Sequence, residues 1–138
     1  CENAEKVVNF LKKHKEITRV IYSTEHEKTI TDRAKQYLKG GNGPMVGIEL
    51  KGGIEAGKKF IESLKMFYHV ANIGDARSLA IHPASTTHSQ LNEKELAASG
   101  VTQSYVRLCI GLEHIDDIID DLDQALNKSS KGTLKAVS

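Results

Sequence analysis

Hydrophobic and polar positions recur with two different periods along this chain, and together they predict helices and strands in mixed order. Residues 1–15 repeat hydrophobic side chains at intervals of three and four, the pattern of an amphipathic helix. Residues 45–51 and 105–110 instead alternate hydrophobic and polar positions, as a strand buried on one face does. The same two patterns predict strands at 19–22, 67–71 and 78–81 and helices at 31–39, 53–64, 92–100 and 115–126.

Helices and strands that alternate with short connections favour one sheet with helices packed on it. We therefore expect an α+β fold with a mainly antiparallel sheet. The helix between 45–51 and 67–71 would allow those two strands to pair in parallel. The chain has 138 residues, no internal repeat and no interdomain linker, which predicts one domain at 1–128 and a flexible tail at 129–138.

The amino-acid composition narrows the classes of molecule that the chain could bind. Lys and Arg number 19 and Asp and Glu 18, interspersed, and only 5% of residues are aromatic, which argues against nucleic-acid binding. No apolar run approaches the ~20 residues of a membrane-spanning helix. Two cysteines make no disulfide framework and no signal peptide is recognisable, so we expect a cytoplasmic protein.

The segment 69–91 crowds Asn, Asp, Arg, Ser, Thr and His into predicted loops, where functional residues often collect, although a loop that only caps its neighbours would be polar too. Its histidines, His82 and His88, match no zinc spacing, and no metal site is expected. Arg107 lies mid-strand, opposite the hydrophobic set. It is either an ordinary surface residue or, in a cleft, a side chain suited to grip a carboxylate with two hydrogen bonds.

Three ordered segments, 70–79, 82–88 and 106–113, resemble the C-terminal domain of the Cys/Met-metabolism enzymes that use pyridoxal phosphate. Residues 116–126 resemble the closing helix of that family, and the resemblance spans 1–128. Asn72 and the run 85–90 are most similar to those of O-acetylhomoserine sulfhydrylases, because the lyases and cystathionine synthases more often carry Ser and Met at residues 72 and 86.

The resemblance implies the small C-terminal domain of a fold-type I enzyme, which uses pyridoxal 5'-phosphate to make homocysteine or methionine from O-acetylhomoserine and sulfide or methanethiol. It implies that Arg107 binds the substrate α-carboxylate, that Asn72 and Ile73 help to orient it, and that Thr87 borders the pocket. For His82 and His88 it implies no role.

The family's Schiff-base lysine and its other cofactor-binding groups belong to the larger N-terminal domain, and no motif here matches them. We therefore expect no catalytic residue in this chain, which would be an inactive, mostly monomeric piece of a homotetrameric enzyme. A related cystathionine gamma-synthase, cystathionine lyase or methionine gamma-lyase, or a stand-alone non-enzymatic domain of the same fold, are the alternatives.

Overall fold

The computed structural model describes residues 1–86 and 102–133, with side chains described through residue 130. Within these residues a five-stranded sheet has the order β1-β2-β5-β4-β3. The neighbouring strands run antiparallel except for β3 and β4, which run parallel. The strands are β1 (Ile17–Ile21), β2 (Met45–Leu50), β3 (Tyr68–His69), β4 (Leu79–Ile81) and β5 (Tyr105–Cys109). This confirms the predicted α+β class with a mainly antiparallel sheet.

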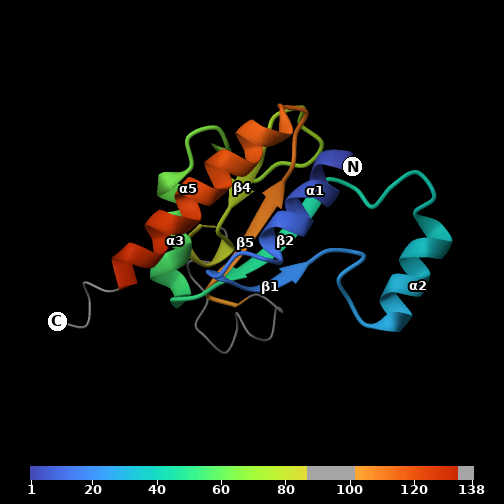
Figure 1. Cartoon of the computed structure of the whole chain (residues 1–138), viewed down its shortest axis with the longest axis horizontal. Helices are drawn as coiled ribbons and strands as arrows, with labels where there is room; N and C mark the ends of the chain where they lie inside the picture. The colour runs from blue at the N-terminus through green and yellow to red at the C-terminus, as the bar shows by residue number, and fades with distance from the viewer. Residues whose placement is uncertain (87–101, 134–138) are drawn as a thin grey trace.

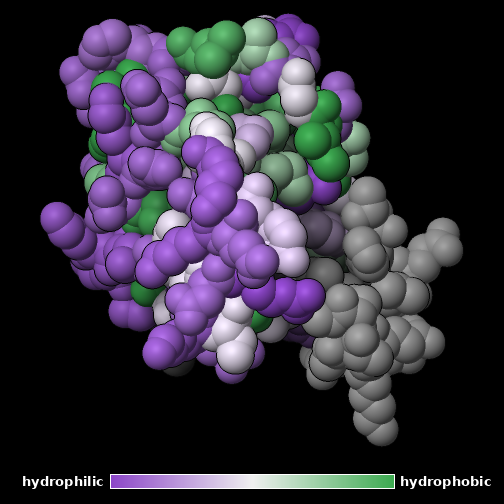
Figure 2. Space-filling view, turned by 90° about the vertical axis from the view of Figure 1, so that its right-hand side faces the viewer, coloured by the Kyte–Doolittle hydropathy of each residue, from purple (hydrophilic) through white to green (hydrophobic). Residues whose placement is uncertain are grey.

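Among the described residues, α1, α3 and α5 lie together against one face of the sheet, whereas α2 projects away from it (Figure 1). The covering helices are α1 (Glu2–Leu11), α3 (Gly53–Ser63) and α5 (Ile115–Thr133). The projecting helix is α2 (Lys28–Tyr37), none of whose residues is buried. The side of the molecule that carries α2 is mostly hydrophilic, with separate hydrophobic patches (Figure 2).

The core lies between the sheet and the three covering helices. Val106 and Leu108 of β5 are fully buried in it, as are Val46 and Ile48 of β2. The helices contribute the hydrophobic side chains that the sequence spacing placed on one face of each: Ala4, Val7, Val8 and Leu11 from α1, Phe60 from α3, and Ile118, Leu122, Ala125 and Leu126 from α5. Because side chains alternate along a strand, Arg107 of β5 projects from the opposite face.

The strand pairing differs from one sequence-based expectation. We expected residues 45–51 and 67–71 to be able to pair in parallel, but β2 lies between β1 and β5, and the parallel partner of β3 is β4. The α3 connection therefore carries the chain across two intervening strands to the far edge of the sheet. The predicted helix at 92–100 lies outside the described residues.

The last helix is longer than its hydrophobic pattern indicated. We expected a tail from residue 129, but α5 continues through Thr133 and Ser129 is only 2% exposed. The hydroxyls of Ser129 and Ser130 donate to the carbonyl oxygens of Leu126 (2.7 Å) and Asn127 (3.1 Å), which satisfies these polar groups inside the helix. The domain boundary at 128 stays a prediction.

Candidate functional site

Arg107 occupies the middle of the central strand. On its two sides it pairs with Gly47 of β2 and Ile81 of β4, so it lies inside the sheet with a neighbouring strand on each side. Its side chain is half-buried and forms no ion pair with any described residue. A half-buried guanidinium without a carboxylate partner has unused capacity to bind an anion, because its fork of N–H groups fits two oxygens at once.

The loop from Val70 to Ser78, which joins β3 to β4, lies beside this guanidinium. Arg107 Nη2 donates to the carbonyl oxygen of Asn72 at 3.4 Å, a contact between residues 35 apart in sequence. Asn72 Oδ1 accepts the backbone N–H of Ile73 at 2.9 Å, and the Ile73 side chain is 63% exposed. The fold therefore brings Arg107, Asn72 and Ile73 together at one corner.

A second part of the same loop is held by an ion pair. Asp75 Oδ1 accepts the backbone N–H of Arg77 at 2.9 Å and lies 3.5 Å from Arg77 Nε. These contacts, the backbone N–H first, hold the pKa of Asp75 below its usual range. The Arg77 guanidinium also lies 4.2 Å from the centre of the Tyr68 ring, a cation–π contact. Arg77 is thus engaged by Asp75 and Tyr68, whereas Arg107 forms no ion pair with any residue that the structure describes.

Tyr105 is a neighbour of this corner that the sequence analysis did not single out. It lies two residues before Arg107 on the same face of β5, and its ring tip covers Gly47: a Cβ on Gly47 would lie 2.7 Å from Tyr105 Cε2 and 2.9 Å from its hydroxyl oxygen. Burial raises the pKa of Tyr105, Arg107 lowers it and Glu49 raises it. The shared strand parity of residues 105 and 107 was the signal that could have identified it.

Of the two histidines in the polar segment, His82 lies among the described residues. His82 is fully buried, with Nδ1 2.9 Å from Ser85 Oγ and Nε2 2.7 Å from the Gln103 carbonyl oxygen. Both ring nitrogens are thus engaged by protein groups. His88 and the expected pocket residue Thr87 lie outside the described residues. Among residues 1–86 and 102–133, no three His, Cys, Asp or Glu side chains gather as a metal site would require.

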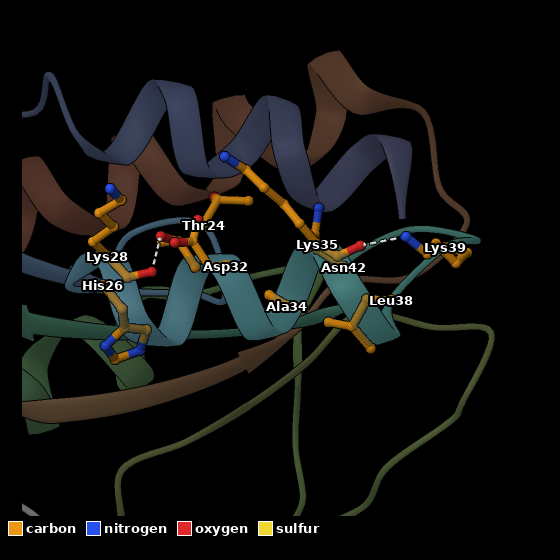
Figure 3. A pocket seen from close by; sticks show the side chains of 10 residues that line it. Thr24, His26, Lys28, Asp32, Ala34, Lys35, Leu38, Lys39 and Asn42 are labelled. Carbon is orange, nitrogen blue, oxygen red and sulfur yellow. Dashed lines mark hydrogen bonds between the residues drawn. The ribbon is translucent and has the colours of Figure 1, made fainter.

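A cavity of about 840 Å³ lies elsewhere, along α2 and the segments next to it (Figure 3). Lysines and polar side chains line most of it, and none of Arg107, Asn72 and Ile73 does. Lys39 Nζ donates to the Lys35 carbonyl oxygen at 2.9 Å at one end of it. The candidate site lies at Arg107 because its guanidinium, without an ion-pair partner in the described part of the chain, lies beside a polar loop, whereas volume alone implies no chemistry.

Comparison with known proteins identifies the family of the domain that contains Arg107, Asn72 and Ile73. The sequence pattern of the Cys/Met metabolism PLP-dependent enzymes matches residues 1–127. The chain belongs to this family. In the part of it that the structure describes, no helix is both long and apolar enough to cross a membrane.

Several Cys/Met metabolism enzymes are close relatives. An O-acetyl-L-homoserine sulfhydrylase of Leptospira meyeri is 52% identical over 125 residues, which cover 90% of this chain and 28% of the relative. An L-methionine gamma-lyase of Fusobacterium nucleatum subsp. polymorphum is 45% identical over 93% of this chain and 32% of its own. This chain therefore spans about a third or less of the length of the relatives it matches.

Solved structures of the same family share the fold. A Campylobacter jejuni structure named as an O-acetylhomoserine (thiol)-lyase, with pyridoxal phosphate bound to a lysine, has a TM-score of 0.82 and 43% identity over 91% of this chain and 30% of that one. A Xanthomonas oryzae cystathionine gamma synthase in complex with cystathionine has a TM-score of 0.80 and 30% identity over 96% of this chain and 34% of that one. The chain thus shares the fold of fold-type I enzymes.

Enzymes of the Cys/Met metabolism family depend on pyridoxal phosphate, so the described residues can be tested against the cofactor. An aldehyde-binding lysine works in a desolvated environment, but no lysine with a described side chain is buried here. The described residues offer an anion-binding guanidinium instead. They fit the substrate side of such an active site and do not by themselves fit the cofactor side.

Proposed function

We propose that this chain is the carboxylate-binding part of the active site of an O-acetylhomoserine sulfhydrylase. The enzyme would make homocysteine or methionine from O-acetylhomoserine and sulfide or methanethiol. The observation that carries the proposal is the half-buried Arg107, unpaired among the described residues and next to the loop that holds Asn72. The relative of this name, 52% identical over 90% of the chain, supports the choice of activity.

Each residue has a part in this proposal. Arg107 binds the α-carboxylate of the amino-acid substrate through two of its N–H groups, while the Asn72 carbonyl accepts Nη2 and holds the guanidinium in place. Ile73 shapes the corner beside it, and Thr87 borders the pocket. The chain has no catalytic residue of its own and is inactive alone, because the cofactor lysine lies in a domain outside it. The whole enzyme is a cytoplasmic homotetramer.

A second activity has its own support, since a methionine gamma-lyase is 45% identical to 93% of the chain. The two activities differ in substrate. A sulfhydrylase consumes O-acetylhomoserine only when sulfide or a thiol is present, whereas a gamma-lyase degrades methionine unaided. Assaying the enzyme that contains this chain with each substrate separates them, and turnover of methionine alone would replace our proposal by the second.

The role of Arg107 is tested in the same enzyme. Removing a charged partner while a buried carboxylate stays behind costs on the order of 2–5 kcal/mol, about 30-fold to several-thousand-fold in affinity. We expect Arg107→Ala to raise KM for the amino-acid substrate within that range. Arg107→Lys should also raise it, since a lysine cannot form the two-bond grip. The visible absorbance of the cofactor should not change, because Arg107 does not hold it.

Arg19 supplies the matched control. It lies on β1 and its side chain is 60% exposed. Its only ion-pair contact among the described residues is a loose one of 3.9 Å to Glu49. Arg19→Ala should leave KM unchanged. If Arg107→Ala also leaves KM unchanged, or loses the cofactor while the fold survives, Arg107 is not the carboxylate ligand.

A further inference from the structure

Glu113 reaches back from the turn after β5 to the end of the loop that carries Asn72. Its Oε1 accepts the backbone N–H of Ser78 at 2.7 Å, and its Oε2 accepts the Ser78 hydroxyl at 2.9 Å. Ser78 is fully buried. Both carboxylate oxygens are therefore engaged by one residue 35 positions earlier, and Glu113 has no cationic partner among the described residues.

The turn itself fits tightly against the loop. The Gly111 backbone N–H donates to Ser78 Oγ at 2.9 Å, and the Leu112 backbone N–H donates to the Ala76 carbonyl oxygen at 2.8 Å. A Cβ on Gly111 would lie 2.4 Å from Glu113 Oε2 and 2.5 Å from the Ala76 oxygen, so only glycine fits at this position. The close contact between turn and loop thus explains the glycine at position 111.

The other side of the turn is fixed to α1. Asn3 Nδ2 donates to the carbonyl oxygens of Gly111 at 3.2 Å and Glu113 at 2.9 Å. The turn is therefore held by α1 behind it and holds the loop in front of it. Residues 76–78, fastened to the turn, set where the loop returns to β4, and the same loop places Asn72 at Arg107.

We propose that Glu113 is a positioning residue for substrate binding: through Ser78 it fixes the loop that places the Asn72 carbonyl on Arg107. The inference rests on the proposed role of Arg107. Glu113 does not touch the substrate. Without its carboxylate, Ser78 loses two charge-assisted hydrogen bonds and the loop is no longer held at one distance from β5. Arg107 then keeps its charge but loses a fixed orientation, which weakens binding without touching the reacting atoms.

The test uses the full-length enzyme with Glu113→Ala, Glu113→Gln and Ser78→Ala. We expect Glu113→Ala to raise KM for the amino-acid substrate about tenfold, the scale of one hydrogen bond to a charged group. The value of kcat should change less than about threefold, because equal loss of ground-state and transition-state binding raises KM alone. Glu113→Gln should have a smaller effect, since its carbonyl oxygen can still accept the Ser78 N–H. Glu62→Ala, an exposed glutamate on α3, is the control.

A double variant separates positioning from general damage to the fold. If Glu113 acts through Arg107, adding Glu113→Ala to Arg107→Ala should raise KM less than twofold further. An undiminished tenfold effect in that background overturns the proposal, as does an unchanged KM in Glu113→Ala when Arg107→Ala raises it. If Arg107→Ala itself has no effect, the proposed function fails instead.

A measurement without activity covers the case in which Glu113→Ala folds poorly. In the 138-residue chain with Ser78→Ala, the amide hydrogen of Leu112, which bonds to Ala76, should exchange at least tenfold faster, while the amides of Val46 and Leu108 keep their rates. With Glu113→Gln the Leu112 amide should also exchange faster, by a smaller factor. Unchanged exchange at Leu112 would mean that Glu113 does not hold the loop, and it would refute the proposal whatever the kinetics.

Discussion

Replacing Gly57 by alanine should destabilise the fold, although alanine is the better helix former. Gly57 lies in α3 against the His82 ring, and a Cβ there would lie 2.4 Å from Nε2, 2.7 Å from Cδ2 and 2.8 Å from Cε1. The ring cannot move aside easily. It is fully buried and anchored at both nitrogens, by the Ser85 hydroxyl and by the Gln103 carbonyl oxygen.

The size of the effect follows from three contributions. Forcing an extra carbon into a packed site costs about 1–3 kcal/mol. Displacing the ring also weakens two hydrogen bonds, each with a net value of about 0.5–1.5 kcal/mol. Alanine in place of glycine returns about 1 kcal/mol of helix propensity. We therefore expect the free energy of unfolding to fall by about 1–5 kcal/mol, which at a slope of about 2 kcal/mol/M lowers the urea midpoint by about 0.5–2.5 M.

Urea unfolding of the 138-residue chain, followed by circular dichroism, measures this loss. Gly40→Ala is the matched control, because no atom lies within 4 Å of its Cβ position and its φ is not positive; it should change the midpoint little. In a His82→Ala background the clash is removed, so Gly57→Ala should become neutral or stabilising. A penalty that persists there, or a Gly57→Ala chain as stable as the parent, would refute the account.

Two further predictions concern the same chain. Burial lowers the pKa of His82; the Gln103 carbonyl raises it in part, Lys58 and His69 lower it, and Glu55 raises it. At pH values between this lowered pKa and the unfolded pKa near 6.5, the unfolded chain binds more protons than the folded chain, so the stability should be complete above about pH 6.5 and fall below it. Urea midpoints measured from pH 7.5 to 5.5 should show this fall. His82→Gln should make the midpoint less dependent on pH. The second prediction is that adding pyridoxal phosphate and then borohydride leaves the mass of the intact chain unchanged apart from scattered lysine adducts, because no lysine with a described side chain is buried. One stoichiometric adduct at a single lysine would contradict this.

Local periodicity was enough to predict most elements of the sheet and its covering helices. The three- and four-residue spacing in residues 1–15 identified the face of α1 that is buried, and alternation in 105–110 placed Val106 and Leu108 in the core with Arg107 on the other face. Both patterns are set by backbone geometry over a few residues. They require no knowledge of what packs against them.

Pairing between distant segments could not be read in this way. Nothing in the pattern of 45–51 distinguishes segment 105–110 from segment 67–71 as its neighbour, because both segments contain hydrophobic residues. The buried position of His82 against Gly57 and the bonds from Glu113 to Ser78 also join residues at least 25 apart. Such contacts depend on how the elements close in space, so the resemblance to a family identified these motifs while their physical roles came from the structure.

The central position of β5 divides the candidate site into a rigid half and an adaptable half. Arg107 lies on a strand that has a paired neighbour on each side, so its backbone is released only when the sheet itself opens. The exposed Asn72 and Ile73 belong to a connection that can open at much lower free energy. When a ligand binds, the loss of conformational entropy therefore occurs almost wholly in the loop. A tighter or looser grip could then evolve by changes in residues 70–75, ahead of the part of the loop that Glu113 holds, without any change in the strand that bears the charge.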